Sequence, residues 1–388
     1  SEMCIRDRDG RKVEVIKDWT KRNDHRHHAM DALTVAFTKP SYIQYLNHLN
    51  ARKDENNKLY TDILGIERKE TTKIHDENGN EKYSGRFNIG ATTINLPRIA
   101  IKNRGDEEGF YKELDRILEI CKENCLFRAR YLENTVAEMA PILWMSGALA
   151  EKNQKDTIKD LIWGGYSTVS IGYIGLSEVS QLLYGKDFSE SEEVYEKTFN
   201  ILKYIADKVL EYKEKYNLGF ALYGTPSESL CDRFARVDKQ EFGDIKGITD
   251  KGYYDNSFHV SSRINMSPFE KLRLEALGHK YSAGGHISYI ETDSLTKNLE
   301  AIPDILRYAK MVGIHYMGIN QPVDKCHICG YKGEFTATKE GFTCPQCGNH
   351  DSNEMSVIRR VCGYLSQPNA RPFNKGKQEE IMHRVKHS

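Results

Sequence analysis

Three features are missing from the sequence: a long apolar run, a leader with a positive charge before an apolar stretch, and any net charge. A membrane-spanning helix needs about 20 mostly apolar residues in succession, so we expect no membrane segment. The 56 Lys and Arg residues balance 56 Asp and Glu residues, which gives no indication of a nucleic-acid or membrane surface. We therefore expect a cytoplasmic protein.

Nine cysteines are present, and four of them form two tight pairs. Cys326 pairs with Cys329 and Cys344 with Cys347, each as CxxC followed by glycine. Four thiolates at this spacing predict a tetrahedral zinc site with no open position for water, so the site would be structural. An iron–sulfur or rubredoxin-like iron site is the alternative. Such pairs fit a reducing compartment better than a disulfide framework.

The chain has 388 residues, which is long enough for two or three domains. Its composition changes near residue 76. The earlier part is rich in charge and histidine, whereas the remainder alternates β-prone runs, amphipathic runs and glycines, which predicts an α/β fold. We expect a strand over 92–101, a strand, turn and helix start over 219–230, and a strand within 284–291. Apolar residues three to four apart predict two helices, one with Leu114, Ile117, Leu118, Cys121 and Cys125, the other with Phe199, Ile201, Leu202, Ile205, Val209 and Tyr212.

The turn in "LYGTPSESL" (222–230) is a candidate for holding a substrate phosphate. Hydroxyls and free backbone N–H groups at a helix N-terminus suit an anion, so we assign substrate contacts to Gly224, Thr225, Ser227 and Glu228. The alternative is an ordinary N-cap, with Thr225 or Ser227 as the cap and Glu228 in the first turn.

The remaining cysteines give weaker signals. Cys121 and Cys125 lie on the apolar side of a predicted helix, so we expect buried structural thiols. Cys231 follows the turn and is open to either a structural or a chemical role. Cys362 directly precedes Gly363, and we interpret it as local packing.

A histidine-rich stretch, "DHRHHAMDA" (24–32), places His28 and Asp31 three residues apart. On a helix the two side chains share a face and could coordinate a divalent cation or position a water for phosphodiester attack. The alternative is a solvated polar face on a helix whose other side is apolar.

Gly363 lies inside a β-prone run, "RRVCGYL" (359–365). Glycine weakens a strand, and in a helix it costs about 1 kcal/mol relative to alanine. By itself the residue indicates a turn or a close backbone approach.

Residues 76–388 resemble the C-terminal half of the anaerobic (class III) ribonucleoside-triphosphate reductases. The resemblance rests on the order and spacing of "GRFNIGATTINLPRIAI", "APILW", "GGYSTVSIGYIGL", "LYGTPSESL", "SAGGHISYIE", the two CxxC pairs and "RRVCGYLSQPNARPFNKGKQEEI". It implies part of a ten-stranded α/β barrel of the glycyl-radical type with a small C-terminal zinc ribbon. A glycyl-radical lyase ordinarily has no four-cysteine ribbon beside its radical loop, and a zinc-binding interaction module would leave "RRVCGYL" unexplained.

The resemblance implies roles for two residues in an oxygen-sensitive reduction of ribonucleoside triphosphates to deoxyribonucleotides. Gly363 matches the glycine that stores a backbone radical, and Asn88 matches the asparagine that accompanies formate as reductant. Removing a hydrogen from the glycine Cα leaves a planar centre conjugated with both neighbouring amides, and a side chain would crowd that planarity.

The resemblance also implies partners. Because no side chain here can generate such a radical, an activase that uses S-adenosylmethionine and an iron–sulfur cluster is implied. Ribonucleoside triphosphate substrates, nucleotide effectors such as ATP, and a homodimer are implied as well.

The thiyl cysteine of the family falls 21 residues before Asn88, where this sequence has Glu67, and no cysteine lies between Cys4 and Cys121. We therefore expect the chain to lack the N-terminal half of the reductase and to show no turnover alone.

Residues 11–74 resemble the last RuvC-like motif of the RNA-guided DNA nuclease of type II CRISPR systems, through "KRNDHRHHAMDALTVAFT" and "YIQYLNHLNARKDENNK". His28 and Asp31 match its catalytic histidine and its metal-ligating aspartate. The other carboxylates are missing, so we expect no functional metal in this helical fragment. A metal-dependent nuclease is the alternative function.

The first ten residues resemble translated sequencing adapter, so we interpret the chain as an assembly chimera, with a genuine fusion as the alternative. The expected divisions are 1–10, the nuclease fragment 11–75, the partial barrel 76–320, and the zinc ribbon with the radical loop 321–388.

Overall fold

A computed structural model describes residues 3–8, 11–16, 87–147, 149–164, 167–227, 229–295, 298–338, 341–361, 363–366 and 373–387. The chain divides into two compact units, 1–61 and 62–388. In the first unit β1 (Met3–Arg8) pairs antiparallel with β2 (Arg11–Ile16). The predicted boundary at residues 75–76 and the predicted nuclease residues His28 and Asp31 lie outside the described ranges, as does Glu67.

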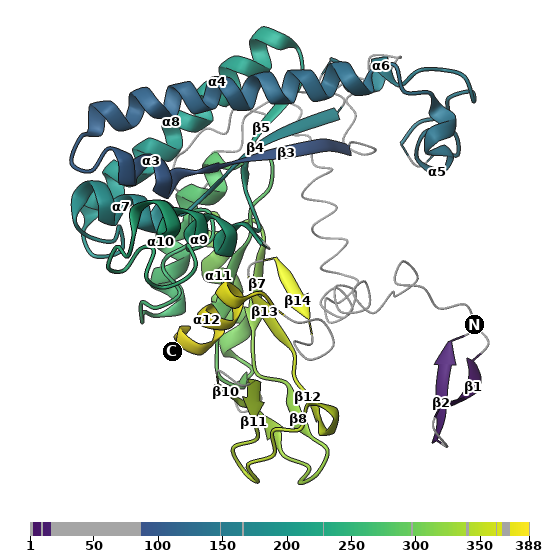
Figure 1. Cartoon of the computed structure of the whole chain (residues 1–388), viewed down its shortest axis with the longest axis vertical. Helices are drawn as coiled ribbons and strands as arrows, with labels where there is room; N and C mark the ends of the chain where they lie inside the picture. The colour runs from purple at the N-terminus through teal and green to yellow at the C-terminus, as the bar shows by residue number, and fades with distance from the viewer. Residues whose placement is uncertain are drawn as a thin grey trace. The chain divides into compact units, whose positions relative to one another are not determined.

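A parallel sheet of three strands organises the second unit (Figure 1). Its order is β3 (Phe87–Asn95), β4 (Ser167–Ile174) and β5 (Gly219–Gly224). Nearly every residue of the central strand β4 is buried, as expected for a parallel strand covered on both faces. Parallel neighbours need long crossover connections, and helices supply them here.

The two helices predicted from apolar spacing are confirmed as α4 (Glu107–Leu132) and α8 (Glu192–Tyr216). Both lie along the sheet, α4 against β3 and α8 against β5 (Figure 1). Between them come η2 (Ala137–Met139), α5 (Pro141–Trp144), α6 (Lys159–Ile162) and α7 (Leu176–Tyr184). The principal core joins the helices to the sheet and includes Phe110, Leu114, Leu118, Ile171 and Phe199.

The predicted strand over 92–101 is wrong beyond Asn95, because a helix, α3 (Leu96–Lys102), begins there. The Asn95 side chain caps this helix by accepting a hydrogen bond from the backbone N–H of Arg98 at 3.2 Å. Pro97 occupies the first turn, where a missing N–H costs nothing and the fixed φ suits a helix. Ile99 and Ile101 are thus β-branched residues of a helix, not of a strand.

A second parallel pair continues the α/β pattern. After α9 (Leu230–Phe242) and α10 (Pro268–Tyr281), the predicted strand within 284–291 is confirmed as β6 (Ser288–Glu291), and α11 (Ala301–Val312) connects it to β7 (Met317–Asn320). A parallel bridge between Tyr223 and Gly285 joins the end of β5 to the segment before β6. The fold is therefore mixed α/β, and closure into a ten-stranded barrel stays a prediction.

The described residues from 324 onward form a small two-sheet ribbon, a hairpin and a helix. The ribbon contains β8 (Asp324–Cys326), β9 (Lys332–Gly333), β10 (Thr336–Thr338), β11 (Gly341–Thr343), η4 (Ser352–Glu354) and β12 (Met355–Ser356). The hairpin is β13 (Arg359–Val361) with β14 (Tyr364–Ser366), and α12 (Lys375–His383) follows (Figure 1). No helix in the described ranges is both long and apolar enough to cross a membrane.

Candidate functional site

Gly363 lies at the turn of the β13–β14 hairpin and contacts the turn that follows β5. Its backbone N–H donates to the carbonyl oxygen of Pro226 at 3.1 Å. A Cβ added at position 363 would come within 2.6 Å of the Pro226 Cβ, far closer than carbon atoms approach without displacement. Both interpretations of this glycine, a turn and a close approach, are therefore correct.

The segment that receives Gly363, residues 224–227, is fixed by hydrogen bonds. The Gly224 N–H donates to the carbonyl of Gly285 at 2.9 Å. Ser227 is 1% exposed and has a left-handed φ of 50°, and its hydroxyl lies 2.5 Å from Asn256 Oδ1 and 2.9 Å from the Thr225 carbonyl. A turn held in this way presents a rigid surface to the hairpin.

Thr225 lies over the carboxyl end of the sheet beside the same turn. Its Oγ1 is 3.3 Å from the hydroxyl oxygen of Thr93 on β3. A Cβ at Gly172 on β4 would lie 2.0 Å from Thr225 Oγ1, so only glycine leaves room for this hydroxyl. Three adjacent strands thus define the position of one hydroxyl group next to the Gly363 hairpin.

The N-cap alternative for this turn is wrong. The helix α9 begins at Leu230 with Ser229 at the N-cap position, and the Ser229 side chain makes no capping hydrogen bond. Neither Thr225 nor Ser227 caps it, because both side-chain hydroxyls are used within the turn and the sheet. Glu228, the fourth predicted substrate contact, lies outside the described residues.

Asn88 occupies an irregularity near the start of β3. Its Nδ2 donates to Ser170 Oγ on β4 at 2.5 Å, and its Oδ1 accepts the Gly90 N–H at 2.6 Å. Asn88 pairs with Thr168, whereas Gly224 pairs with Tyr173, five residues further along β4. Five residues of strand correspond to roughly 16 Å, so the structure does not bring Asn88 and the Gly363 turn together.

The cysteines of the helices are buried, as expected. Burial raises the pKa of Cys121 to about 12 and of Cys125 to about 11, which keeps both as neutral thiols at neutral pH. Cys231 is also buried, in an apolar cluster that contains Val361 of the Gly363 hairpin. Cys362 lies outside the described residues.

The four predicted zinc ligands converge, with their sulfur atoms all within 4.8 Å of one another. The Sγ atoms of Cys326 and Cys347 are 3.7 Å apart, as are those of Cys329 and Cys344. Sulfur ligands at about 2.3 Å from a tetrahedral zinc ion are separated by about 3.8 Å, so the donor set and its geometry fit zinc.

Two matching backbone turns hold these cysteines. Gly330 N–H donates to the Cys326 carbonyl at 3.1 Å, and Gly348 N–H donates to the Cys344 carbonyl at 2.9 Å. Hydrogen bonds from the Cys329 backbone, the Ile328 backbone and the Asn349 amide lower the pKa of Cys326 to about 6. These N–H groups favour the thiolate of Cys326, which is the form that binds metal. At Cys329 the Tyr331 backbone hydrogen bond acts in the same direction, but desolvation and hydrogen bonds to the other three sulfurs raise the pKa to about 12.

A buried ion pair connects this ribbon to the Gly363 hairpin. Asp324, two residues before Cys326 and 1% exposed, accepts hydrogen bonds from Arg359 Nη1 at 2.5 Å and Nη2 at 2.6 Å. The Phe335 N–H donates to Asp324 as well, at 2.8 Å. Arg359 begins β13, so the position of the ribbon determines where the hairpin starts.

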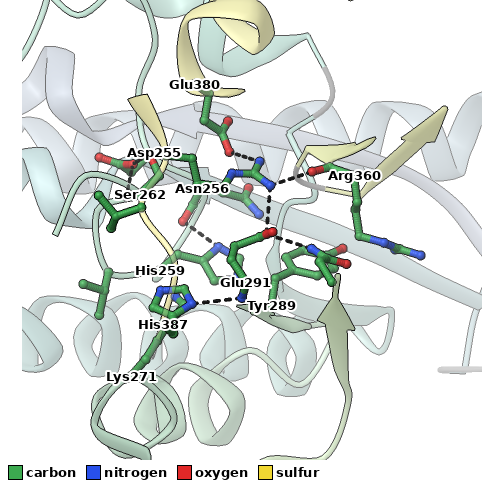
Figure 2. A pocket seen from close by; sticks show the side chains of 14 residues that line it. Asp255, Asn256, His259, Ser262, Lys271, Tyr289, Glu291, Arg360, Glu380 and His387 are labelled. Carbon is green, nitrogen blue, oxygen red and sulfur yellow. Dashed lines mark hydrogen bonds and ion pairs between the residues drawn. The ribbon is translucent and has the colours of Figure 1, made fainter. Parts of the chain in front are cut away.

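The C-terminal segment also contacts the hairpin, around a polar pocket (Figure 2). Arg384 Nη1 donates to the Arg360 carbonyl at 2.7 Å and to Glu291 Oε1 at 2.8 Å, while Nη2 donates to Glu380 at 2.5 Å. His387 extends the contact, since its N–H donates to the Glu291 carbonyl at 2.7 Å and its Nδ1 accepts the Glu291 N–H at 2.9 Å.

These supporting residues were missed from the sequence. Asp324, Arg359, Arg384 and His387 have no characteristic local spacing, and the partners that tie them to distant segments lie 24 to 96 residues away. One signal was available for Asp324: an acidic residue two positions before a CxxC pair.

Known proteins resemble the chain over most of its length. A family model described as "Anaerobic ribonucleoside-triphosphate reductase" matches residues 13–387. The "Anaerobic ribonucleoside-triphosphate reductase" of Haemophilus influenzae is 44% identical over 315 residues, which are 81% of this chain and 44% of that protein. The chain therefore spans less than half the length of this relative.

Solved structures share the fold. One described as "Anaerobic ribonucleotide reductase" has a TM-score of 0.61 and 20% identity, covering 81% of this chain and 47% of that one. The anaerobic ribonucleotide reductase from Thermotoga maritima in complex with dATP and CTP has a TM-score of 0.53 and 21% identity, over 77% and 47% of the two chains. At these identities the structures show a common fold alone.

Proposed function

Because the chain belongs to the anaerobic ribonucleoside-triphosphate reductase family, we propose that it carries the radical-storing part of that reductase, with the unpaired electron on Gly363. The observation that carries this proposal is the packing of Gly363 against Pro226, where a Cβ has no room. A glycine fixed in this contact can become a planar, amide-conjugated radical without a side chain to obstruct it.

The reaction of the whole protein would reduce a ribonucleoside triphosphate with formate as reductant. Formate gives up two electrons and becomes carbon dioxide, the ribose loses its 2′-hydroxyl as water, and a C–H bond takes its place. The nucleotides dATP and CTP in the complex of the Thermotoga relative support nucleotide binding by this fold.

A partner must create the radical. Taking a hydrogen atom from the glycine Cα needs a strong one-electron oxidant, which no side chain of this protein supplies, so we propose an activase that uses S-adenosylmethionine. Each strand of the hairpin that carries Gly363 is only three residues long. A partner could therefore reach Gly363 if the hairpin moves away from Pro226. Nucleotide effectors and a homodimer belong to the same proposal.

We assign Thr225 as the first candidate for a substrate phosphate. Its hydroxyl lies beside the Gly363 turn and makes a long contact of 3.3 Å to Thr93, whereas the Gly224 N–H and the Ser227 hydroxyl have closer protein partners, at 2.9 Å and 2.5 Å. Asn88 is distant along the sheet, so its part in formate-dependent reduction would require a substrate or a loop that spans the sheet.

The ribbon would bind zinc through Cys326, Cys329, Cys344 and Cys347 and hold the hairpin by way of Asp324. With four sulfur ligands the ion has no open position, so its contribution is structural. The position that matches the thiyl cysteine is Glu67, and we therefore expect radical storage without turnover from this chain alone.

The nuclease fragment remains a separate hypothesis. Its residues 17–75 lie outside the described ranges, residues 11–16 form the strand β2 where a helical fragment was expected, and the reductase family model already matches from residue 13. Reads spanning residues 65–85 of the coding sequence test the join, and a magnesium-dependent cleavage assay tests the activity. A His28→Ala variant is the control for that assay.

Electron paramagnetic resonance of the anaerobically activated protein tests the radical proposal. A glycyl radical keeps one hydrogen on Cα, so we expect a doublet. Protein grown with glycine deuterated at Cα should give a single narrow line instead, because deuterium splits the signal far less. A doublet that survives deuteration would place the radical on another residue type and refute the proposal.

A further inference from the structure

Three histidines outside the site described above converge on one point. His279 comes from α10, His286 lies two residues before the start of β6, and His315 lies two residues before the start of β7. One ring nitrogen of each lies within 4.8 Å of the others, and the ring centroids of His286 are 4.5 Å from His279 and 5.3 Å from His315. We propose that His286 and His315 bind a divalent transition-metal ion, with His279 as the residue that positions them.

The hydrogen bonding of His286 defines its tautomer. Its Nδ1 lies 2.7 Å from the carbonyl oxygen of Ser282, and a carbonyl can only accept, so Nδ1 carries the proton. The lone pair of the neutral ring is then on Nε2. A histidine that donates one ring N–H to a backbone carbonyl, and so keeps the lone pair of the other nitrogen for an ion, has the usual arrangement of a metal ligand.

His315 supplies the second nitrogen at the right separation. Its Nδ1 is 3.3 Å from His286 Nε2. Two nitrogen ligands at about 2.0–2.1 Å from a tetrahedral zinc ion are about 3.3–3.4 Å apart. The pair can therefore accept an ion with a small outward movement of either ring.

His279 positions the backbone of His315 through a hydrogen bond. Its Nδ1 accepts the backbone N–H of His315 at 3.2 Å, and its Nε2 lies 2.9 Å from Ser288 Oγ. Ser288 in turn donates to the buried carboxylate of Glu275 at 2.6 Å. Both nitrogens of His279 thus have protein partners, which makes it a support for the site and not a ligand.

The surroundings indicate which ions fit. His279 is 1% exposed, His286 is half-buried and His315 is exposed, so an ion would reach the pair from solvent and complete its coordination with water. Imidazole nitrogen favours zinc, copper and nickel over magnesium and calcium. This site differs from the four-thiolate site in ligand type and in its open positions, and it does not depend on the radical chemistry.

The competing interpretation is an N–H···N hydrogen bond between the two rings, with no affinity for metal. Isothermal titration calorimetry with zinc chloride at pH 7.5 distinguishes a metal site from a hydrogen bond without metal affinity. The protein used should already hold one zinc per chain by elemental analysis. We expect one further equivalent to bind. His315→Gln should weaken it about tenfold or more, since one of two protein ligands is lost.

His383→Gln is the matched control, because His383 is an exposed histidine on α12 whose Nδ1 faces its own helix carbonyl. It should bind the second zinc as the unmodified protein does. The thermal midpoints of both variants, measured without added zinc, should match that of the unmodified protein. The proposal is overturned if no second equivalent binds, or if His315→Gln binds it with unchanged affinity.

Discussion

Replacing Gly363 with alanine tests both the packing and the chemistry assigned to this residue. The added Cβ would lie 2.6 Å from the Pro226 Cβ, whereas ordinary contacts begin near 3.4 Å, so the two segments must separate by roughly 0.8 Å. Overpacking of this kind costs about 1–3 kcal/mol. The shift also stretches the 3.1 Å hydrogen bond from the Gly363 N–H to the Pro226 carbonyl.

A loss of about 1–3 kcal/mol reduces the docked population of the hairpin relative to the released one by roughly 5- to 150-fold. Trypsin cleavage after Arg359 and Arg360 measures this directly, because both arginines lie in β13 and cleavage follows the open population when opening is fast. We expect Gly363→Ala to be cleaved faster by that factor and to give no radical doublet after activation.

The double variant Pro226→Gly/Gly363→Ala separates the two effects. Removing the proline ring removes the atoms that collide with the new Cβ, so resistance to trypsin should recover in large part. The doublet should stay absent, because an alanine Cα has no second hydrogen to retain. If Gly363→Ala resists trypsin as the unmodified protein does, the packing argument is wrong; if it gives the doublet, the radical assignment is wrong.

Four further predictions follow from other parts of the protein. Asp324→Ala should lower the free energy of unfolding by about 3–5 kcal/mol in urea titrations, because it leaves the mostly buried Arg359 unpaired; Glu113→Ala, in an exposed pair, should cost less than about 1 kcal/mol. Cys344→Ser should lower the zinc content from one ion per chain to none and speed proteolysis of residues 324–357, and iron in the unmodified protein would contradict the zinc assignment. Asn88→Ala should cost about 1 kcal/mol through its bond to Ser170 yet leave the radical yield unchanged. Burial lowers the pKa of His387 to about 3, whereas an exposed histidine has a pKa of about 6.5. The C-terminal segment should therefore stay docked above about pH 6.5 and be released progressively as the pH falls towards 3, which proteolysis of residues 373–387 measures. An equal pH-dependent release in His387→Gln would refute this.

Local spacing determined what could be predicted. The CxxC pairs indicated the four sulfur ligands because each pair is held by a turn of its own, and 3–4-residue spacing indicated α4 and α8 because the buried face repeats with the helix. The β-branched run at 92–101 predicted a strand throughout, but Asn95 caps a helix in the middle of the run. The tertiary context therefore overrode strand propensity.

Contacts between distant segments could not be predicted. The separation of Asn88 from the Gly363 turn depends on the register of β3 and β5 against β4, which no single segment encodes. The contacts of Arg384 with Glu291 and with the Arg360 carbonyl are similar cases, because each joins residues 24 to 93 positions apart. The three histidines have separations of 7 and 29 residues and follow no helical or strand period.

The link between Asp324 and Arg359 has a consequence for damage by air. Cys347 is exposed and Cys326 is two residues from Asp324. If the ribbon holds zinc, an oxidant that attacks the Cys347 thiolate would release the ion and destabilise the ribbon. Asp324 would then no longer be held in place to bind Arg359. Gly363 would then lose its contact with Pro226 although the oxidant had not reacted with the glycine. Reducing the thiols and adding zinc should restore that contact.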